Sequence, residues 1–338
     1  MRKSIALLAL ALAACATLPE GGQIGASSAH YSNPVFDRNF PDPAVLQVAG
    51  GWYYAYATRS ASGDGSFNIQ VARSRDLIRW EHLGDALPAK PPWAAAKQAF
   101  WAPHVIHDGA QDRYFMYYSA EPDDAPGKCL GVATARAAAG PFTDSGKPLL
   151  CGEGIEDIDP MAFDDPKTGK RLLYWGSGSK PIRVQELAAN RVDFLPGSAP
   201  RNLIFPDPSQ RYRSLVEGAW VIYRDGSYFL FYSGDRCCAR EPAYAVMVAR
   251  ARDAFGPFEE KGEPILEASD AWLAPGHVCI AVDGRGRDWL VYHATRAGEQ
   301  ERKRAMLLDP LVYRGGWPAV AGRQPSTISE EVPARRFE

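Results

Sequence analysis

Three acidic side chains and one histidine recur in similar local contexts along the chain. Asp42 and Asp159 each precede a proline, Glu217 precedes a glycine, and His277 follows the pair Pro275-Gly276. The spacings between these four residues are 117, 58 and 60 positions. Carboxylates gathered in one pocket perturb each other's pKa, so that one can stay protonated while another stays ionised. The pattern therefore predicts acid–base chemistry, provided that the fold brings the four residues together.

The elements that must position these residues are repeated pairs of apolar segments. In each repeat a short apolar segment follows the opening residue, and an aromatic-rich segment comes after a turn. Residues of this kind are typical of β-strands. The central residues of the five aromatic segments are 62, 58, 56 and 61 positions apart, and such a period indicates a propeller or an array. The aromatic segments are residues 52–56, 114–118, 172–175, 228–232 and 289–293.

The repeats contain further strand-like segments. In the first repeat, residues 42–48, 52–58 and 67–74 read as strands, and residues 75–80 read as a turn with a short fourth strand. About four strands in each of five repeats predict an all-β fold, a five-bladed β-propeller. A β-sandwich or a two-domain β-protein is the alternative. The first strand of each blade of a propeller lines the central channel. We therefore expect the residues at one repeat position to surround one end of this channel. These residues are Asp42, the Trp101 segment, Asp159, Glu217 and His277.

Five short motifs follow one another at blade spacing. They are Phe40-Pro41-Asp42-Pro43, Trp101-Ala102-Pro103, Ile158-Asp159-Pro160, Glu217-Gly218 and Pro275-Gly276-His277. In this order they resemble the successive signatures of glycoside hydrolase family 43, over residues 33 to 320. The resemblance implies a five-bladed propeller that hydrolyses α-L-arabinofuranosides, β-D-xylosides and a few galactans with inversion. The residues themselves suit this reaction, because glycoside hydrolysis needs an acid for the leaving oxygen and a base or nucleophile opposite it.

The resemblance also implies a role for each carboxylate. Asp42 matches the general base that activates water, and Glu217 matches the general acid. Asp159 matches the third carboxylate, which tunes and holds the acid. Inverting enzymes keep their two carboxyl groups roughly 6.5–9.5 Å apart to admit the water.

Four further residues are expected near the sugar, namely Phe100, Trp101, His277 and Arg304. Arg304 matches an arginine that contacts the sugar in the family, although Arg302 and Lys303 lie close enough to leave this register open. Phe100 and Trp101 are expected to place an aromatic face at the mouth, with blade packing as the alternative for Trp101.

His277 matches a histidine near the propeller axis, which in many members of the family lies beside a bound calcium or sodium ion. The resemblance does not imply that the reaction requires a cofactor. A lone histidine is more often structural than a ligand. The sequence departs from the family at His104, where many members carry an acidic residue.

The N-terminal residues read as a targeting segment rather than as part of the fold. Residues 1–3 are basic at two positions, residues 5–14 are apolar, and Leu12-Ala13-Ala14-Cys15 resembles the lipobox of bacterial lipoproteins. We therefore expect a signal peptide over residues 1–15 with lipidation at Cys15, a flexible tether over 16–32 and the propeller over 33–338. An ordinary cleaved signal is the alternative. The absence of Asp at position 16 favours the outer membrane, with lipid as the only membrane anchor.

The charge and the cysteine content of the chain limit the kinds of partner and metal site that we expect. The formal net charge of −2 offers no basic excess for nucleic acid, so that class of partner is disfavoured. Apart from Cys15, five cysteines remain, and the sequence does not decide their pairing; adjacent Cys237 and Cys238 could bond to each other or elsewhere. No spacing typical of a structural zinc site occurs.

We expect a monomeric, exported enzyme acting on arabinose- or xylose-containing glycans. An exo-acting α-L-arabinofuranosidase is favoured, with β-D-xylosidase and endo-1,5-α-L-arabinanase as alternatives. A non-catalytic carbohydrate-binding propeller is the alternative of a different class, and a phosphorylase or levansucrase-like enzyme is a further one.

Overall fold

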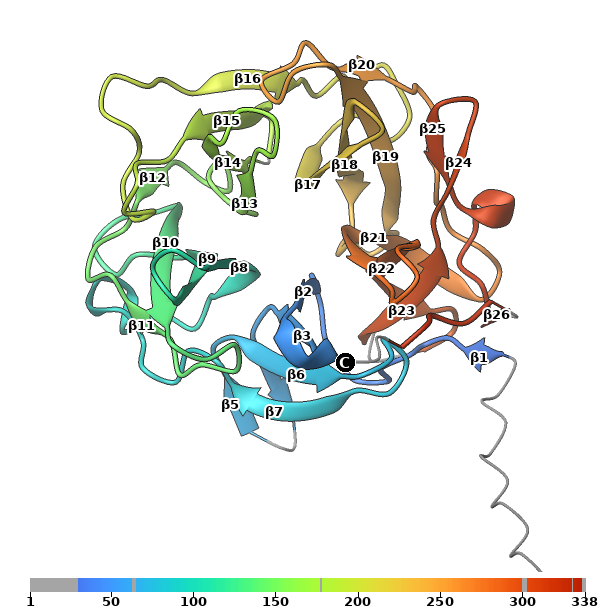
Figure 1. Ribbon diagram of the computed structural model, residues 1–338, viewed down its shortest axis with the longest axis horizontal. Coiled ribbons are helices and arrows are strands. Elements are labelled where there is room, and N and C mark those ends of the chain that lie inside the picture. Colours follow the sequence, from blue (N-terminus) through green and yellow to red (C-terminus); the bar gives the residue numbers. More distant parts are fainter. Residues whose placement is uncertain (1–29, 63–64, 177, 300–302, 330, 336–338) are drawn as a thin grey trace, which may run out of the picture.

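The computed structural model describes residues 30–62, 65–176, 178–299, 303–329 and 331–335. Five antiparallel sheets stand around a common axis as the blades of a propeller, which confirms the predicted fold (Figure 1). The expected signal peptide, Cys15 and most of the expected tether lie outside the described residues. Within the described part, no helix is long and apolar enough to cross a membrane.

The first strand of every blade lies nearest the axis and the later strands follow outward (Figure 1). Blade 1 contains β2 (Ala44–Gln47), β3 (Tyr53–Ala57), β6 (Gln70–Ser74) and β7 (Glu81–Asp85). Blade 2 contains β8 (Trp101–Asp108), β9 (Arg113–Ala120) and β10 (Lys128–Ala135), which pairs with both β11 (Thr143–Asp144) and β12 (Leu150–Gly152). Blade 3 contains β13 (Met161–Asp164), β14 (Arg171–Trp175), β15 (Ile182–Glu186) and β16 (Arg201–Ile204). Blade 4 contains β17 (Val216–Arg224), β18 (Ser227–Arg236), β19 (Ala243–Ala251) and β20 (Glu259–Glu260), and blade 5 contains β21 (Trp272–Val282), β22 (Asp288–Arg296) and β23 (Arg304–Pro310).

The remaining elements are short. Three two-stranded ladders pair β1 (Tyr31–Ser32) with β26 (Ile328–Ser329), β4 (Ser60–Ser62) with β5 (Gly65–Phe67), and β24 (Val312–Arg314) with β25 (Trp317–Ala319). Single turns of 3₁₀ helix cover Ala49–Gly51, Pro92–Ala94 and Ala321–Arg323. The predicted fourth strand of blade 1 was placed too early, since β7 begins after Trp80.

The N-terminal segment closes the ring against the last blade. Phe36 bridges Met306 of β23, and the side chain of Asn33 bonds the backbone of Leu308 in both directions. Tyr31 is buried and donates its hydroxyl to the Leu308 carbonyl at 2.6 Å. Within the described residues, strand pairing thus begins at Tyr31, because Tyr31–Ser32 form β1.

The aromatic strands fill the space between neighbouring blades. The hydroxyl of Tyr56 in blade 1 donates to the Ala138 carbonyl of blade 2, and that of Tyr117 in blade 2 donates to the Arg191 carbonyl of blade 3. Tyr174 of blade 3 makes the same kind of bond to Ala254. A buried tyrosine adds a large apolar contact, and its hydroxyl needs a partner. These tyrosines thus fix blades 1, 2 and 3 each against the following blade.

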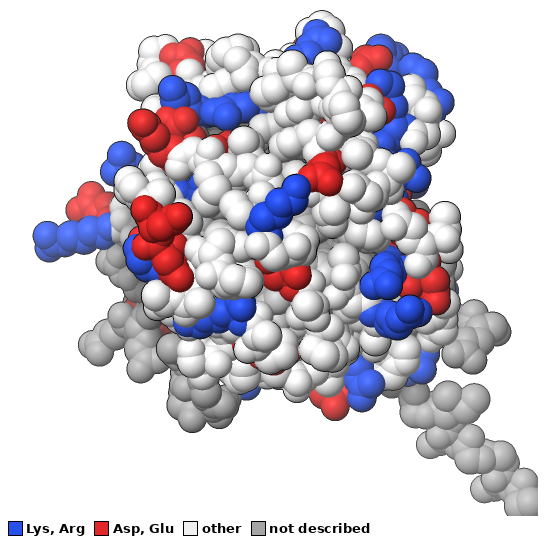
Figure 2. Space-filling model, turned by 90° about the vertical axis from the view of Figure 1, so that its left-hand side faces the viewer, with Lys and Arg blue, Asp and Glu red and all other residues white. Residues whose placement is uncertain are grey.

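The surface carries both signs of charge. On the side in Figure 2, acidic and basic residues lie in small mixed groups separated by uncharged residues. This distribution agrees with the small net charge of −2.

Two disulfides are present among the described residues. Cys129 on β10 bonds Cys151 on β12, and Cys237 bonds its neighbour Cys238. Cys279 is buried and free. The pairing that the sequence left open is thus one inter-strand bond and one bond between adjacent residues.

Candidate active site

The residues at the entry to the five inner strands share an unusual backbone conformation. Each has a positive φ, which is uncommon for residues other than glycine. Because the conformation recurs once in every blade, it identifies the structurally equivalent positions. These are Asp42 (57°), Ala102 (44°), Asp159 (58°), Gly218 (62°) and His277 (49°).

Glu217 is therefore not at the same repeat position as Asp42 and Asp159, and the prediction was wrong by one residue. Gly218 holds the equivalent position, and Glu217 pairs with Ser233 just before a register shift in β17. Trp101 pairs with Ser119 before a similar shift in β8. Bulges of this kind redirect side chains at the edges of functional sites, so Glu217 reaches the pocket from its own position.

A second repeat feature holds the entry residues in place. In four blades a side chain at the end of the aromatic strand accepts the backbone N–H of the next blade's entry residue. Three of the acceptors are hydroxyls and the fourth is an imidazole. The pairs are Thr58 with Ala102 (2.8 Å), Ser119 with Asp159 (3.0 Å), Ser233 with His277 (2.8 Å) and His293 with Asp42 (3.1 Å).

Blade 3 breaks this pattern. Its aromatic strand ends at Gly176, which has no side chain to offer, and the N–H of Gly218 donates instead to the carboxylate of Asp159 at 3.0 Å. Buried backbone N–H groups are almost always paired. Asp159 thus holds the backbone beside Glu217, which ties the two carboxyl groups together.

Asp42 is buried and surrounded by cationic or hydrogen-bonding groups. Its Oδ1 accepts a bond from Nη1 of Arg304 at 2.9 Å, and its Oδ2 accepts one from the Thr58 hydroxyl at 2.5 Å. Burial alone would raise the pKa of Asp42, but Arg304, His277 and His293 together hold it well below the ordinary 3.8. Asp42 is therefore ionised over the whole physiological range, as a base requires.

Asp159 lies in the opposite electrostatic situation. Burial raises the pKa of Asp159 well above 3.8, and the negative charges of Glu217 and Asp42 raise it further. The bond from the Gly218 N–H does not offset these effects. The site thus contains two buried carboxyl groups whose environments push their pKa values apart, so that Asp42 is ionised while the pKa of Asp159 beside it is raised.

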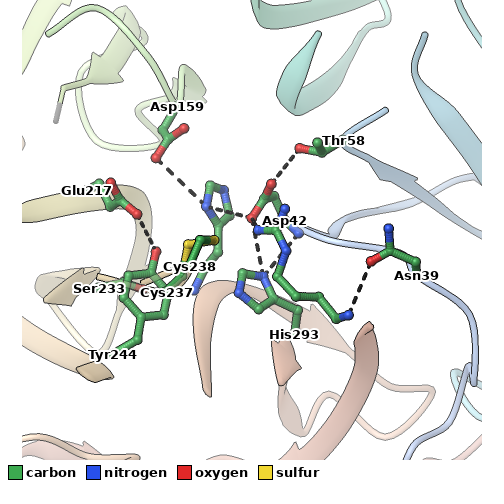
Figure 3. The surroundings of a disulfide bond; sticks show 12 residues. Asn39, Asp42, Thr58, Asp159, Glu217, Ser233, Cys237, Cys238, Tyr244 and His293 are labelled. Carbon is green, nitrogen blue, oxygen red and sulfur yellow. Dashed lines mark hydrogen bonds and ion pairs between the residues drawn. A yellow bond between two sulfur atoms is a disulfide. The ribbon is translucent and has the colours of Figure 1, made fainter. Parts of the chain in front are cut away.

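Glu217 is half-buried and is held by Tyr244 of the same blade. The Tyr244 hydroxyl donates to Oε1 of Glu217 at 2.8 Å (Figure 3). The tyrosine ring fits only because residue 276 is glycine, since a Cβ there would lie 2.2 Å from Cε1 of Tyr244. The glycine of the Pro275-Gly276-His277 motif therefore makes room for the partner of Glu217.

His277 lies between the two aspartates. Its Nδ1 is 3.5 Å from Oδ1 of Asp42 and 3.8 Å from Oδ2 of Asp159. Burial lowers the pKa of His277, so its imidazole is neutral at physiological pH. The structure thus places His277 between Asp42 and Asp159, in the lining of the axial cavity.

The axial cavity is small and poor in oxygen ligands. It measures about 10 Å³, which is room for about one water, and its titratable side chains are those of His104, Asp159 and His277. Calcium takes about six to eight oxygen ligands, and no group of three or more metal-binding side chains occurs in the described part of the chain. These residues do not build a calcium cage.

His104 packs its ring against Trp220 and accepts the N–H of Ala162 at 3.3 Å. Burial lowers the pKa of His104 to about 3, so it is a neutral structural residue.

The expected sugar-contacting residues differ in their placement. Arg304 faces Asp42, whereas the amine of Lys303 pairs with Asp37 at 2.6 Å, so Arg304 rather than Lys303 serves the site. Arg302 lies outside the described residues. Trp101 is partly exposed, and the Lys128 amine lies 3.6 Å from the centre of its ring system.

Phe100 does not form part of the mouth. It is fully buried and packs against Tyr118, with 6.0 Å between ring centroids. Neighbouring side chains along an extended segment point to opposite sides. Trp101 and Phe100 therefore cannot both face the sugar, and the prediction for Phe100 was wrong.

Tyr244, Thr58 and His293 are site residues that the sequence analysis missed. Thr58 and His293 sit at the ends of aromatic strands, where Ser119 and Ser233 occupy the equivalent places. A hydrogen-bonding side chain at this repeat position was the signal that could have identified them. Tyr244 had no such signal, because it reaches Glu217 across the blade.

Comparison with known proteins places this geometry in a family. The family model "Glycosyl hydrolases family 43" matches residues 31–318. The extracellular endo-alpha-(1->5)-L-arabinanase 2 of Bacillus subtilis is 24% identical, over 87% of this chain and 73% of its own. The beta-D-galactofuranosidase xynD of Aspergillus niger is 28% identical, over 85% and 83%. A solved thermostable family-43 glycoside hydrolase superposes with a TM-score of 0.75 at 26% identity, over 91% of this chain and 100% of that one. From the matched motifs, the five-bladed fold and the converging carboxylates, we conclude that this chain belongs to glycosyl hydrolase family 43 and is a glycosidase.

Proposed function

We propose that the protein is an inverting glycosidase that releases pentose units from arabinose- or xylose-containing glycans, foremost an exo-acting α-L-arabinofuranosidase. The observation that carries this proposal is the convergence of Glu217 with Asp42 and Asp159, two carboxyl groups whose pKa values are shifted in opposite directions. One buried carboxyl group has its pKa held well below 3.8 and the other has it held well above. A site that only bound carbohydrate would not need this contrast.

Asp42 is the proposed general base. Arg304 is the strongest of the groups that keep it ionised, and Thr58 and Arg304 fix the direction of its oxygens. A water beside Asp42 gives up a proton to the carboxylate as it attacks the anomeric carbon. Arg304, which is partly exposed, also contacts the sugar in this proposal.

Glu217 is the proposed general acid. The Tyr244 hydroxyl holds its carboxyl group, and Asp159 anchors the adjoining backbone through Gly218. The acid gives its proton to the glycosidic oxygen while the bond to the anomeric carbon breaks. Direct displacement by water inverts the configuration at that carbon.

The relatives support pentose glycans as substrates. Besides endo-arabinanases, they include the extracellular exo-alpha-(1->5)-L-arabinofuranosidase ArbA of Cellvibrio japonicus at 24% identity and xylosidase/arabinosidase 43B of Humicola insolens at 26%. Their variety keeps β-D-xylosidase as an alternative to the favoured activity.

Endo-1,5-α-L-arabinanase is the second candidate, because the site adjoins a cavity of about 910 Å³ that includes Arg304. Ligand sites typically measure ~300–1,000 Å³, so this cavity has room for more than one sugar. Chromatography of early products from arabinan separates the candidates: an exo-enzyme releases arabinose first, and an endo-enzyme releases longer oligosaccharides first.

A panel of aryl glycosides tests the proposed activity. Wild-type enzyme should cleave an arabinofuranoside or a xyloside, and Glu217→Ala should lose about 10²–10⁴-fold in rate on unactivated substrates. A substrate with a good leaving group should recover part of that loss. If wild type releases no sugar from any glycoside of the panel, from arabinan or from xylan, the hydrolase proposal fails.

We also propose export with lipidation at Cys15, attachment to the outer membrane through lipid alone, and a monomeric state. Two of the cited relatives are described as extracellular, which supports export. Metabolic labelling with a fatty acid should mark wild type but not Cys15→Ala. Size-exclusion chromatography with light scattering measures the oligomeric state.

The proposed reaction requires no cofactor, so activity should persist in EDTA. A loss of activity that calcium or sodium reverses would instead assign an ion to the propeller axis.

A further inference from the structure

The large cavity beside the catalytic carboxylates is bordered by the Cys237–Cys238 disulfide. Its lining includes Cys237, Cys238, Asn39, Arg296 and Arg304. Arg304 is the residue whose guanidinium contacts Asp42 at 2.9 Å, so this cavity adjoins the site through Arg304. Figure 3 shows the disulfide close to the catalytic residues, on the side of Tyr244.

The disulfide lies in the loop of the blade 4 hairpin that supports Glu217. The ladder between β18 and β19 ends at the pair Arg236 and Ala243, and residues 237–242 connect the strands. Tyr244, which donates to Glu217, is the second residue of β19 after this loop. Cys237 is half-buried and Cys238 is exposed, so a bound molecule can reach the bond.

The position of this disulfide does not suit a structural staple. The Cys129–Cys151 bond joins two strands that are 22 positions apart in sequence. The Cys237–Cys238 bond joins neighbours, and a disulfide stabilises a fold less as the loop that it closes becomes shorter. What the bond does supply is a fixed local shape with two polarisable sulfur atoms, a surface suited to apolar contacts.

We propose that the Cys237–Cys238 disulfide contacts the sugar that departs, the unit joined to the pentose being cleaved. Glu217 protonates the oxygen between these two sugars, so a surface on the Glu217 hairpin that borders the cavity lies toward the departing unit. The C–H face of that sugar packs on the sulfur atoms. This inference rests on the proposed hydrolase function and assigns Cys237 and Cys238 to substrate specificity.

The test compares two substrates on wild type and on the double variant Cys237→Ser/Cys238→Ser. A pentosyl fluoride has no departing sugar, whereas the matching unsubstituted disaccharide has one. The variant should lose roughly tenfold in kcat/KM on the disaccharide, mainly through KM, since the loss of one small apolar contact is worth at least about that much. On the fluoride it should stay within about twofold of wild type.

Reduction of the native enzyme provides an independent measurement that needs no substitution. A mild reductant that opens the Cys237–Cys238 bond, followed by mass spectrometry of the alkylated thiols, should reproduce the loss on the disaccharide. The double variant treated in the same way is the control, because only its Cys129–Cys151 bond can respond. Its activity should not change with reductant.

The outcomes separate the inference from the function on which it rests. Equal losses on both substrates would overturn the inference, since the disulfide would then act on the catalytic groups. No loss on either substrate, in the variant and in the reduced native enzyme, would also overturn it. A wild-type enzyme that cleaves neither substrate would overturn the proposed function, and this inference with it.

Discussion

Nδ1 of His293 accepts the backbone N–H of Asp42 at 3.1 Å, so the last blade of the propeller holds the proposed base of the first. Burial lowers the pKa of His293 to about 4, which keeps its imidazole neutral and able to accept this bond at neutral pH. The ring closure that completes the fold is thus also a direct support of the site.

Replacing His293 should therefore affect both stability and turnover. His293→Ala leaves the buried N–H of Asp42 without an acceptor, at a cost of about 1–3 kcal/mol. We expect a lower melting temperature and a lower kcat. His293→Asn, whose amide oxygen can accept the bond, is the matched control and should retain more of both. An alanine variant that melts and turns over like wild type would contradict this role.

Arg304 should set the acidic limit of activity. Burial favours the protonated form of Asp42, and Arg304 is the strongest of the groups that oppose it. In Arg304→Gln the pKa of Asp42 rises, so the acidic limb of kcat/KM should move to higher pH. Lys303→Gln is the control, because this neighbouring cation pairs with Asp37 instead. Profiles with coincident acidic limbs for Arg304→Gln and wild type would exclude the proposed electrostatic role.

The raised pKa of Asp159 should lower the stability of the folded protein at neutral pH. The unfolded chain releases this proton near 3.8, whereas the folded protein holds it to a higher pH, so stability falls as pH rises through the folded pKa. Asp159→Asn removes this cost and can still accept the Gly218 N–H. We expect the variant to melt above wild type at pH 7, with the difference shrinking toward pH 3.8, while activity falls.

Asp283→Asn is the matched control, for which we expect the melting temperature to change in the opposite direction. Burial alone would raise the pKa of Asp283, but the backbone N–H groups of Ala334, Arg287 and Arg285 lower it. The Asp283→Asn variant loses this stabilised carboxylate, so it should melt below wild type at pH 7. If both asparagine variants shift the melting temperature in the same direction, the assignment for Asp159 is wrong.

Tyr244 should matter most when the leaving group needs a proton. Tyr244→Phe removes the bond to Glu217, whose carboxyl group becomes charged as it gives up its proton, and a hydrogen bond to a charged group contributes about 1.5–3 kcal/mol. We expect kcat on a disaccharide to fall at least about tenfold, and kcat on a pentosyl fluoride to fall less. Tyr232→Phe removes an equivalent bond to Glu260 in the same blade and should leave both rates near wild type. Equal losses on both substrates in Tyr244→Phe would argue against support of an acid.

Much of the fold could be predicted because every blade of the propeller uses the same strand pattern and the same kind of packing. Each aromatic strand packs between two blades, so the same residue types return once in every blade. The motifs around Asp42 and Asp159 also recur with the same backbone conformation, which is why their convergence followed from spacing alone. The chain closure was less visible, since the pairing of Phe36 with Met306 joins segments with no shared pattern.

The details that escaped prediction depend on single-residue geometry. A register shift places Glu217 one residue before the repeat position, and the spacing between motifs is too variable to reveal it. Phe100 and Trp101 are neighbours in sequence but occupy opposite sides of the chain. The bond between Cys237 and Cys238 was one of several pairings that the sequence allowed.

The stereochemistry of the first product tests the central claim most directly. If Asp42 activates water while Glu217 protonates the departing oxygen, a single displacement must invert the anomeric carbon. Proton NMR during early hydrolysis of an α-L-arabinofuranoside, or of a β-D-xyloside if that is the substrate cleaved, should show the opposite anomer first, with the original anomer appearing only by mutarotation. Initial release of the anomer with retained configuration would contradict the account.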